Sequence, residues 1–457
     1  MAKESGMRNM TVGSPIRHII LFSLPLLAGN LLQQLYNMVD SWVVGNYVSD
    51  AALAAVGTGF PVIFFFSSLF MGISTGGTVM IAQFYGGGKP EKVRQAVDTL
   101  YTAFVWGIVP VTLFAVVMVK PLMVLLRVDE AAYHEAFIYL SVVCAGLIGT
   151  IGYNLNAGIL NGVGDSSSTL LFLAVSSLLN IILDLVLVLA VDLGVLGVAL
   201  GTIIAQSCSW LFGLFYINRR YPEIAIHPFN GIFDGTLFRD ILKIGLPAGL
   251  QMSLVSIGTM FALSKINSYG KAFTAGFNVG NKLDSLAFLP IQSLAAAITA
   301  FVGQNIGAKE TERAEYGTKV TAIFAALWTA LTAVVLCIWG PQLSGLFSPD
   351  LPVIEASTTY LRCIMPPYAL FAVVFVLNGA MRGAGDSLFP MLNVVASLIL
   401  IRVPFLYLLA NRFGSAYMYH SYGIGWTVGF IITMWYYLAG KWRTKTLTDE
   451  NSNEWRE

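Results

Sequence analysis

The chain has 457 residues, of which 56% are hydrophobic and only 11% are charged, and its formal net charge is +1. Soluble domains carry about 25% charged residues, so this composition excludes an ordinary soluble protein and indicates an integral membrane protein. The net charge by itself argues neither for nor against a nucleic-acid partner, and we expect none.

A transmembrane helix needs roughly 17 to 25 mostly apolar residues. By this criterion the sequence predicts twelve spans, near 17–44, 52–83, 93–119, 131–160, 166–190, 194–218, 238–266, 272–304, 312–340, 352–381, 387–410 and 421–440. The first is not expected to be a signal peptide, because Asn and Gln residues interrupt its apolar core. Basic residues favour one side of the spans, roughly eighteen against about six. We therefore expect a multi-pass protein of the inner (cytoplasmic) membrane with both termini cytoplasmic.

An internal repeat relates the two halves of the chain. Its clearest pairs lie about 221 residues apart: Leu24-Pro25 with Leu246-Pro247, and Gly162-Val163-Gly164-Asp165-Ser166 with Gly383-Ala384-Gly385-Asp386-Ser387. Since each copy has six spans, an even number, both copies start on the same side of the membrane and the repeats are parallel. The sequence predicts an amino-terminal lobe over 1–219, a polar cytoplasmic linker over 220–236 and a carboxyl-terminal lobe over 237–457. A central cavity is expected between the lobes.

Several of these motifs carry a family resemblance. The run Leu35-Tyr36-Asn37-Met38-Val39-Asp40, with Val44-Gly45 and the segment 51–57, resembles the first two helices of multidrug and toxic compound extrusion (MATE) transporters. The turn at 83–88 and the two Gly-x-Gly-Asp-Ser loops fit the same family, and the chain looks like its DinF-like bacterial branch. The resemblance covers essentially the whole chain. It implies a twelve-helix, all-α fold and efflux of drugs or toxic cations driven by H⁺ or Na⁺.

Among the acids of the predicted spans, Asp40 lies near the outer end of the first and Asp184 in the middle of the fifth. A carboxylate there costs about 2.5 to 3.5 kcal/mol, so it should face a partner or a wet cavity. Polar residues recur at three- and four-residue steps beside both acids, and the neighbouring spans add more. These residues are Asn30, Gln33 and Asn37 with Asp40, Ser176 and Asn180 with Asp184, Thr202 and Gln206 on the sixth span, and Asn154 on the fourth.

Such a cluster is suited to two kinds of ion. Desolvation and a second carboxylate nearby favour protonation, so Asp40 or Asp184 could bind a proton. Carboxylate, amide and hydroxyl oxygens are also the hard ligands that Na⁺ prefers. The resemblance implies that Asp40, Asn180, Asp184 and Thr202 form the family's cation or proton site. The alternative for Asp40 is a hydrogen-bonding or capping role at a helix end.

Prolines interrupt the first and seventh predicted spans, at Pro25 and Pro247, and each allows a bend. In the MATE family, bending around such a proline is proposed to accompany protonation. Pro25 is therefore the predicted hinge, with ionised Asp40 favouring a straight helix and protonated Asp40 a bent one. The alternative is a proline that the membrane helix merely tolerates.

The carboxyl-terminal half lacks a matching acidic site in its seventh and tenth spans, where another branch of the family carries acids. It has instead Lys282, Asp284 and Arg402 within spans and Lys265 near an outer end. Lys282 and Asp284 point in different directions on one helix, so each is expected to pair with another helix. Lys265 and Arg402 are expected to extend toward the outer interface. Asp165 and Asp386 are expected to cap the helices that follow them.

The expected substrates are amphipathic organic cations, held by stacking and cation–π contacts. The candidates for substrate contact are Gln34, Tyr36, Asn37, Tyr139, Asn154 and Asn156. We expect a monomer surrounded by membrane lipids, without a cofactor beyond the coupling ion. No Walker motif and no nucleophile, metal or His/acid constellation is visible, so an ATPase or another enzyme is not expected. The alternative function is flipping of a lipid-linked oligosaccharide or another lipid, for which Lys282 and Arg402 offer positive charge.

Overall fold

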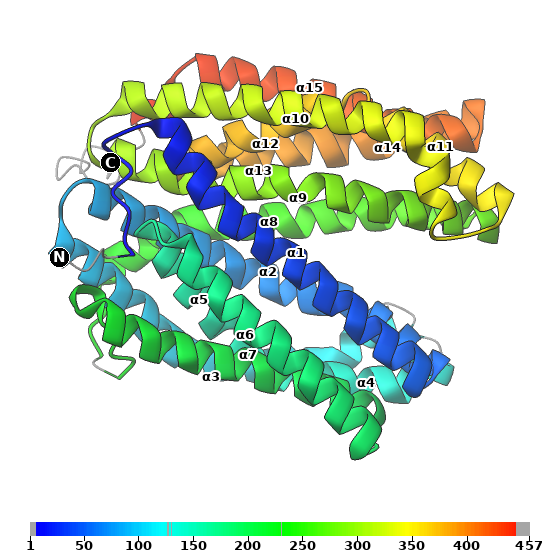
Figure 1. Cartoon of the computed structure of the whole chain (residues 1–457), viewed down its shortest axis with the longest axis horizontal. Helices are drawn as coiled ribbons and strands as arrows, with labels where there is room; N and C mark the ends of the chain where they lie inside the picture. The colour runs from blue at the N-terminus through cyan, green and yellow to red at the C-terminus, as the bar shows by residue number, and fades with distance from the viewer. Residues whose placement is uncertain (1–5, 126–127, 129, 230, 445–457) are drawn as a thin grey trace. The chain divides into compact units, whose positions relative to one another are not determined.

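The computed structural model describes residues 6–125, 128, 130–229 and 231–444. These residues form fifteen α-helices joined by short 3₁₀- and π-helical segments (Figure 1). The first half of the chain contains α1 (Pro15–Tyr47), α2 (Asp50–Gly86), α3 (Pro90–Leu125), α4 (Glu130–Ala145), α5 (Leu147–Gly162), α6 (Ser166–Leu185), η1 (Val186–Ala190), α7 (Gly194–Arg220) and η2 (Pro222–Ile224). The second half contains α8 (Gly235–Asn267), α9 (Lys271–Gly307), α10 (Thr311–Gly345), α11 (Leu351–Ile364), α12 (Tyr368–Gly383), α13 (Leu388–Val394), η3 (Val395–Arg402), α14 (Val403–Phe413), η4 (Ser415–Tyr419), α15 (His420–Leu438) and η5 (Lys441–Thr444).

Nine helices in the described ranges are long and apolar enough to cross a membrane. Two bent helix pairs pass the same test when each pair is taken as one span, which gives up to eleven. The twelfth predicted span, 421–440, corresponds to α15, which has 19 residues and is made less apolar by its Gly, Trp and Tyr residues. The predicted all-α integral membrane fold is confirmed.

Two predicted spans are broken where the sequence suggested continuous helices. The span at 131–160 divides into α4 and α5, which meet at a 47° bend, and the span at 352–381 divides into α11 and α12 with a bend of 59°. Pro366 and Pro367 explain the second break, because proline lacks a backbone N–H and clashes with the preceding turn. Gly146 stands at the first break, where a Cβ would lie 2.2 Å from the Ile203 side chain of α7.

The chain divides into two compact units whose limits fall inside two helices. Unit 1 comprises the described residues up to Met10 together with Leu24–Gly249, and unit 2 comprises Thr11–Ser23 and the described chain from Leu250. These limits differ from the predicted lobes 1–219 and 237–457, whose ends at 1–5 and 445–457 lie outside the described residues. The division passes through α1 one residue before Pro25, and through α8 two residues after Pro247.

The first part of α8 belongs to unit 1 because glycines let its backbone approach α2. A Cβ added to Gly249 would lie 2.7 Å from the carbonyl oxygen of Ser68, and one added to Gly72 would lie 2.4 Å from the Gly249 nitrogen. Upstream of this contact, Asp234 caps α8 by accepting from the Leu237 N–H at 3.0 Å. The Gln95 side chain of α3 donates to the same carboxylate at 2.9 Å. These contacts hold the start of α8 against α2 and α3.

The segment predicted as a polar linker, 220–236, is only partly polar. Tyr221, Ile224 and Ile226 are buried. The Asn218 side chain of α7 exchanges two hydrogen bonds with the backbone of Ile226, at 2.8 and 2.6 Å. These three apolar side chains pack against the protein, and the role of the segment as a linker between lobes stays a prediction. Asn230 of this segment lies outside the described residues.

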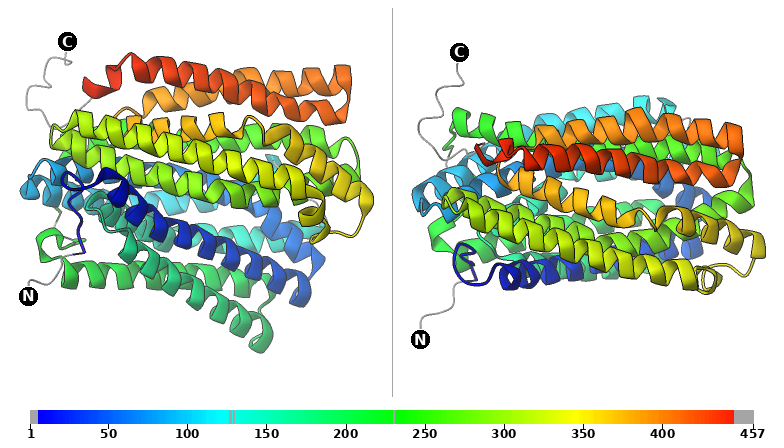
Figure 2. Two further views of the ribbon diagram at one scale, coloured as in Figure 1. Left: turned by 45° about the horizontal axis from the view of Figure 1, so that its top comes forward. Right: turned by 90° about the horizontal axis from the view of Figure 1, so that it is seen from above.

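Both units use the same close contact between their second and fourth spans. In unit 1, Thr78 of α2 donates to the Gly158 carbonyl of α5 at 2.9 Å. In unit 2, Thr299 of α9 donates to the Gly379 carbonyl of α12, also at 2.9 Å. Elsewhere in unit 2, α15 packs against α12, α14 and η3 (Figure 2). The repeated contact shows that the internal repeat of the sequence is a repeat of helix packing.

The two Gly-x-Gly-Asp-Ser loops are helix caps, as predicted. Asp165 accepts from the Ser168 N–H at 3.0 Å, and Asp386 accepts from the Phe389 N–H at 3.3 Å. A tyrosine from a later helix end or loop completes each cap, Tyr221 at 2.5 Å and Tyr436 at 2.6 Å. Burial and the neighbouring Asp165 raise the pKa of Tyr221, so its hydroxyl keeps the proton that it donates.

Candidate functional site

The two intramembrane acids of unit 1 meet. Asp40 is half-buried within α1, well before the helix ends at Tyr47, and it does not cap a helix end. Asp184 is fully buried near the end of α6. Their carboxyl groups lie in hydrogen-bonding contact with each other. Residues far apart in the chain are thus brought to one point inside the membrane-spanning part of the unit.

This contact has a chemical consequence. An ionised carboxylate has acceptors only, so two carboxylates in contact need a shared proton or a bound cation between them. Asp40 Oδ1, Asp184 Oδ2 and Asn180 Oδ1 are all buried without a hydrogen-bond donor. Asn180 turns its amide nitrogen toward Asp184 Oδ1 at 3.4 Å. Three buried oxygens therefore remain available for a proton or a metal cation.

Tyrosines of α1 and α4 lie near this acid pair. Tyr36 of α1 and Tyr139 of α4 both interact electrostatically with Asp40 and Asp184, and Tyr36 also forms a side-chain hydrogen bond with Gln33. Tyr153 of α5, which the sequence analysis missed, interacts with Tyr36. The sequence could have indicated Tyr153, because it is next to Asn154 on a span that was already selected for its amide side chains.

A glycine of α7 makes room for Asp184. A Cβ added to Gly201 would lie 2.2 Å from Asp184 Oδ1, closer than any real contact of that kind. Thr202 follows on the same helix and is half-buried, and its hydroxyl donates to the Val198 carbonyl at 3.1 Å. That bond leaves the acceptor lone pairs of the Thr202 oxygen free for a cation.

The remaining candidates for substrate contact differ in their surroundings. Gln34 and Asn154 are half-buried and Asn37 is exposed, and the Asn154 amide donates to the Thr150 carbonyl at 2.8 Å. Asn156 is fully buried, accepts from the Tyr101 hydroxyl and donates to the Trp210 carbonyl at 2.9 Å. Asn156 is therefore a packing residue between α5, α3 and α7, and its contact with a substrate stays a prediction.

The basic residues of unit 2 correct one expectation and support another. Arg402 does not extend to the interface, since its side chain is buried and its guanidinium lies 3.5 Å from the ring centre of Tyr422. Lys265 is half-buried and donates to Asn411 at 2.9 Å. Lys282 lies over the Phe347 ring at 5.9 Å, and Asp284 accepts from Tyr360 at 3.1 Å, so each contacts another helix or its end. The sequence missed the burial of Arg402 because a charged residue near a span end usually reaches water.

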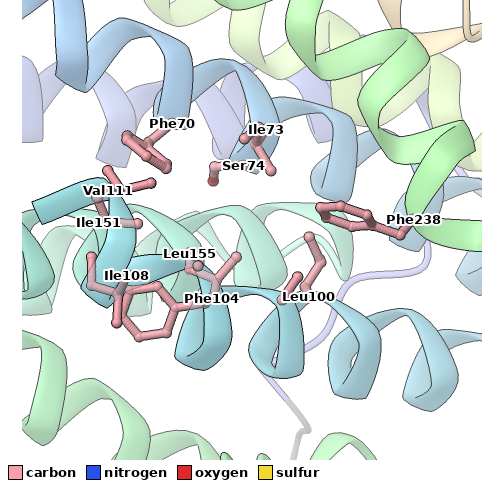
Figure 3. A pocket seen from close by; sticks show the side chains of 12 residues that line it. Phe70, Ile73, Ser74, Leu100, Phe104, Ile108, Val111, Ile151, Leu155 and Phe238 are labelled. Carbon is pink, nitrogen blue, oxygen red and sulfur yellow. The ribbon is translucent and has the colours of Figure 1, made fainter. Parts of the chain in front are cut away.

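Unit 1 also contains a separate apolar cavity of about 210 Å³. Side chains of α2, α3, α5 and α8 line it, among them Ile73, Phe104, Leu155 and Phe238 (Figure 3). Its polar lining residue, Ser74, donates its hydroxyl proton to the Asn154 carbonyl at 2.6 Å. The cavity therefore suits an apolar group and offers no charge to an ion.

Two parallel six-helix repeats, with a buried pair of acids in one of them, define an integral membrane protein of the MATE type. The family profile described as MatE matches residues 25–186 and again 247–408, so the chain belongs to the MatE family and the predicted repeat is confirmed.

Relatives and solved structures extend over nearly the whole chain. The probable multidrug resistance protein YpnP of Bacillus subtilis is 28% identical over 446 residues, which cover 97% of this chain and 99% of the relative. A MATE crystal structure described as the straight conformation has a TM-score of 0.88 at 24% identity and covers 98% of this chain and 100% of its own. One described as the bent conformation has a TM-score of 0.87 at 23% identity, with coverages of 97% and 98%.

Proposed function

We propose that this protein is a secondary active transporter that exports amphipathic organic cations in exchange for H⁺ or Na⁺ by alternating access. The observation that carries the proposal is the contact between the buried carboxyl groups of Asp40 and Asp184. Such a pair needs a cation between its members. Burying two carboxyl groups costs free energy that a merely structural role does not offset. The name of the relative YpnP supports multidrug efflux.

The proton is the first candidate for the coupling ion, because a single proton satisfies both carboxyl groups by making one the donor to the other. Na⁺ is the second candidate, favoured by the buried and unpartnered oxygen of Asn180 beside the two acids. Thr202, one residue after the glycine that faces Asp184, would add a hydroxyl oxygen. The ion would bind the same four residues in either case.

The substrate side of the proposal rests on the two tyrosines near the acids and on amide side chains of α1 and α5. We assign substrate contact to Gln34, Tyr36, Asn37, Tyr139 and Asn154. Rings and amides of this kind suit flat cations through stacking and cation–π contact. The protein would act as a monomer in the inner membrane, with both termini cytoplasmic and lipid around it, and as a transporter rather than an enzyme.

Lipid flipping is supported less well, because a pyrophosphate headgroup needs accessible positive charge. Of the two basic residues on which this alternative rests, Arg402 is buried against Tyr422, and Lys282 is exposed and lies over the Phe347 ring. A single exposed lysine offers less positive charge than a pyrophosphate headgroup needs.

Reconstitution into liposomes with a proton gradient and a sodium gradient imposed separately tests the proposal, with ethidium as the transported probe. We expect one of the two ions to drive ethidium in the direction opposite to its own flow. A tenfold ion gradient supplies about 1.4 kcal/mol per ion exchanged. Liposomes without a gradient serve as the control. Absence of transport under both gradients would sink the antiport mechanism.

Pro25 is proposed as the hinge of the transport cycle. The helix α1 runs unbroken through Pro25, contrary to the predicted interruption, because a membrane helix can absorb one missing hydrogen bond by local adjustment. Proline nevertheless frees a backbone carbonyl at the position where α1 passes from one unit to the other. Two similar solved structures are described as a straight and a bent conformation, which supports a conformational change in this fold.

Pro25→Ala is expected to slow gradient-driven ethidium transport about tenfold, equivalent to ~1.4 kcal/mol, and to flatten its dependence on pH. Initial rates in liposomes measure the effect. The matched control is Pro110→Ala, which replaces an exposed proline inside α3. Equal rates and equal pH profiles for Pro25→Ala and Pro110→Ala would rule out the hinge.

A further inference from the structure

Unit 2 contains a buried group of charged and phenolic side chains that the proposed transport site does not use. Asp284 of α9 accepts from the Tyr360 hydroxyl of α11 at 3.1 Å, and Tyr368 of α12 forms a second side-chain hydrogen bond with it. Arg402, the last residue of η3, places its guanidinium 3.5 Å from the ring centre of Tyr422 of α15. We refer to these five residues as the Asp284–Arg402 cluster. They come from five separate elements of one unit.

Each charge in this cluster lacks a full set of hydrogen bonds. Arg402 is only 6% exposed, and its Nε has no hydrogen-bond partner. Asp284 Oδ1 is likewise buried and without a donor. The guanidinium and the carboxylate interact electrostatically although they form no direct salt bridge. A buried charge that is neither fully hydrogen-bonded nor neutralised costs several kcal/mol of folding free energy. The charge of Arg402 and the charge of Asp284 therefore stabilise each other.

The acid cluster of unit 1 is built in a related way. Tyr139 beside Asp40 and Asp184 and Tyr360 beside Asp284 stand about 221 residues apart, at the same position of the repeat. In each unit a π-helical segment of the fifth span adjoins the charged residue, η1 after Asp184 and η3 ending at Arg402.

A glycine of the sixth span lies against the charged residue in both units, against the carboxyl group of Asp184 in unit 1 and against the base of the Arg402 side chain in unit 2. A Cβ added to Gly201 would lie 2.2 Å from Asp184 Oδ1, and one added to Gly425 would lie 3.0 Å from the Arg402 Cβ. The sign of the charge is the difference between the units. Unit 1 brings two acids together, whereas unit 2 brings one acid and one arginine.

We propose that Arg402 is a tethered cation that occupies, beside Asp284, the place that an exchangeable cation takes in the acid cluster of unit 1. Unit 2 is thereby kept electrically neutral without binding H⁺ or Na⁺. Removing the arginine uncovers a latent cation site formed by Asp284 with the Tyr360 and Tyr368 hydroxyls. This inference goes beyond the proposed function and concerns ion binding in unit 2 alone, so it is tested without transport.

Infrared difference spectroscopy of the purified full chain, between mildly acidic and mildly alkaline pH, detects carboxyl groups that take up a proton. In Arg402→Met we expect an additional protonated-carboxyl C=O band at acidic pH, absent from the double variant Arg402→Met/Asp284→Asn. The single variant Asp284→Asn, which retains Arg402, should have the same carboxyl bands as the native protein. The matched control Lys265→Met removes a half-buried basic residue of the same unit and should add no band. Absence of the new band in a folded Arg402→Met protein, or loss of a native band in Asp284→Asn, overturns the proposal.

Thermal unfolding gives a second and independent test. It compares melting temperatures, so it can be applied even if a single variant is destabilised. Asp284→Asn leaves a buried cation unpaired and Arg402→Met leaves a buried anion unpaired, so each should lower the Tm. The double variant should melt above both single variants, because it contains neither charge. Arg402→Lys keeps the charge and should melt above Arg402→Met. A double variant whose Tm falls by the sum of the two single losses shows that the charges are independent and overturns the proposal.

Discussion

Replacement of Asp184 by asparagine is expected to abolish ion-driven ethidium transport while leaving the protein folded. The substitution keeps the size of the side chain but removes the charge and one acceptor from the contact with Asp40. A contact to a charged group contributes about 1.5 to 3 kcal/mol, so affinity for the coupling ion should fall by more than about tenfold. Unfolding stability should change little or rise, because a buried charge has been removed.

Transport in liposomes under each ion gradient measures the first effect, and thermal unfolding in detergent measures the second. The matched control is Asp192→Asn, which alters an exposed acid between spans at a backbone φ of 60°, a conformation that asparagine tolerates well. Asp192→Asn should transport at the native rate. Native transport by Asp184→Asn under both gradients would remove Asp184 from the coupling mechanism.

Gly201→Ala is expected to damage the ion site without adding or removing any charge. The new methyl group would lie 2.2 Å from Asp184 Oδ1, so either the carboxyl group or the helix α7 must shift. Overpacking of this kind costs about 1 to 3 kcal/mol. If the shift separates Asp184 from Asp40, gradient-driven transport should fall about tenfold or more, in line with that free energy.

Gly107→Ala is the matched control for this prediction, since a Cβ at that helical glycine of α3 meets no atom within 4 Å. It should leave transport unchanged and raise stability by about 0.5 to 1 kcal/mol, because alanine loses less conformational freedom than glycine in a helix. Ethidium rates and melting temperatures of the two variants should be compared directly. Indistinguishable behaviour of Gly201→Ala and Gly107→Ala would show that the contact with Asp184 is unimportant.

The acid cluster shows how much of the site can be predicted from helical periodicity. Asn180 and Asp184 are one turn apart, so a helix alone places them on one face. The cost of burying a carboxylate in a membrane then predicts that Asp184 must find a partner. Periodicity says which residues share a face, but it does not say which other helix that face meets. The contact of Asp184 with Asp40, and the space that Gly201 leaves for it, depend on the packing of α1, α6 and α7.

The sequence by itself determined the membrane-embedded all-α class, the internal repeat and the two aspartate caps. Each of these follows from local composition, length or spacing, which act through neighbouring residues or through the solvent. Only the tertiary structure decided that Arg402 is buried against Tyr422, that Asn156 is a packing residue and that the compact units divide inside α1 and α8. These properties depend on contacts between segments distant in the chain, where a side chain's surroundings are set by the helix that covers it and not by its own sequence neighbours.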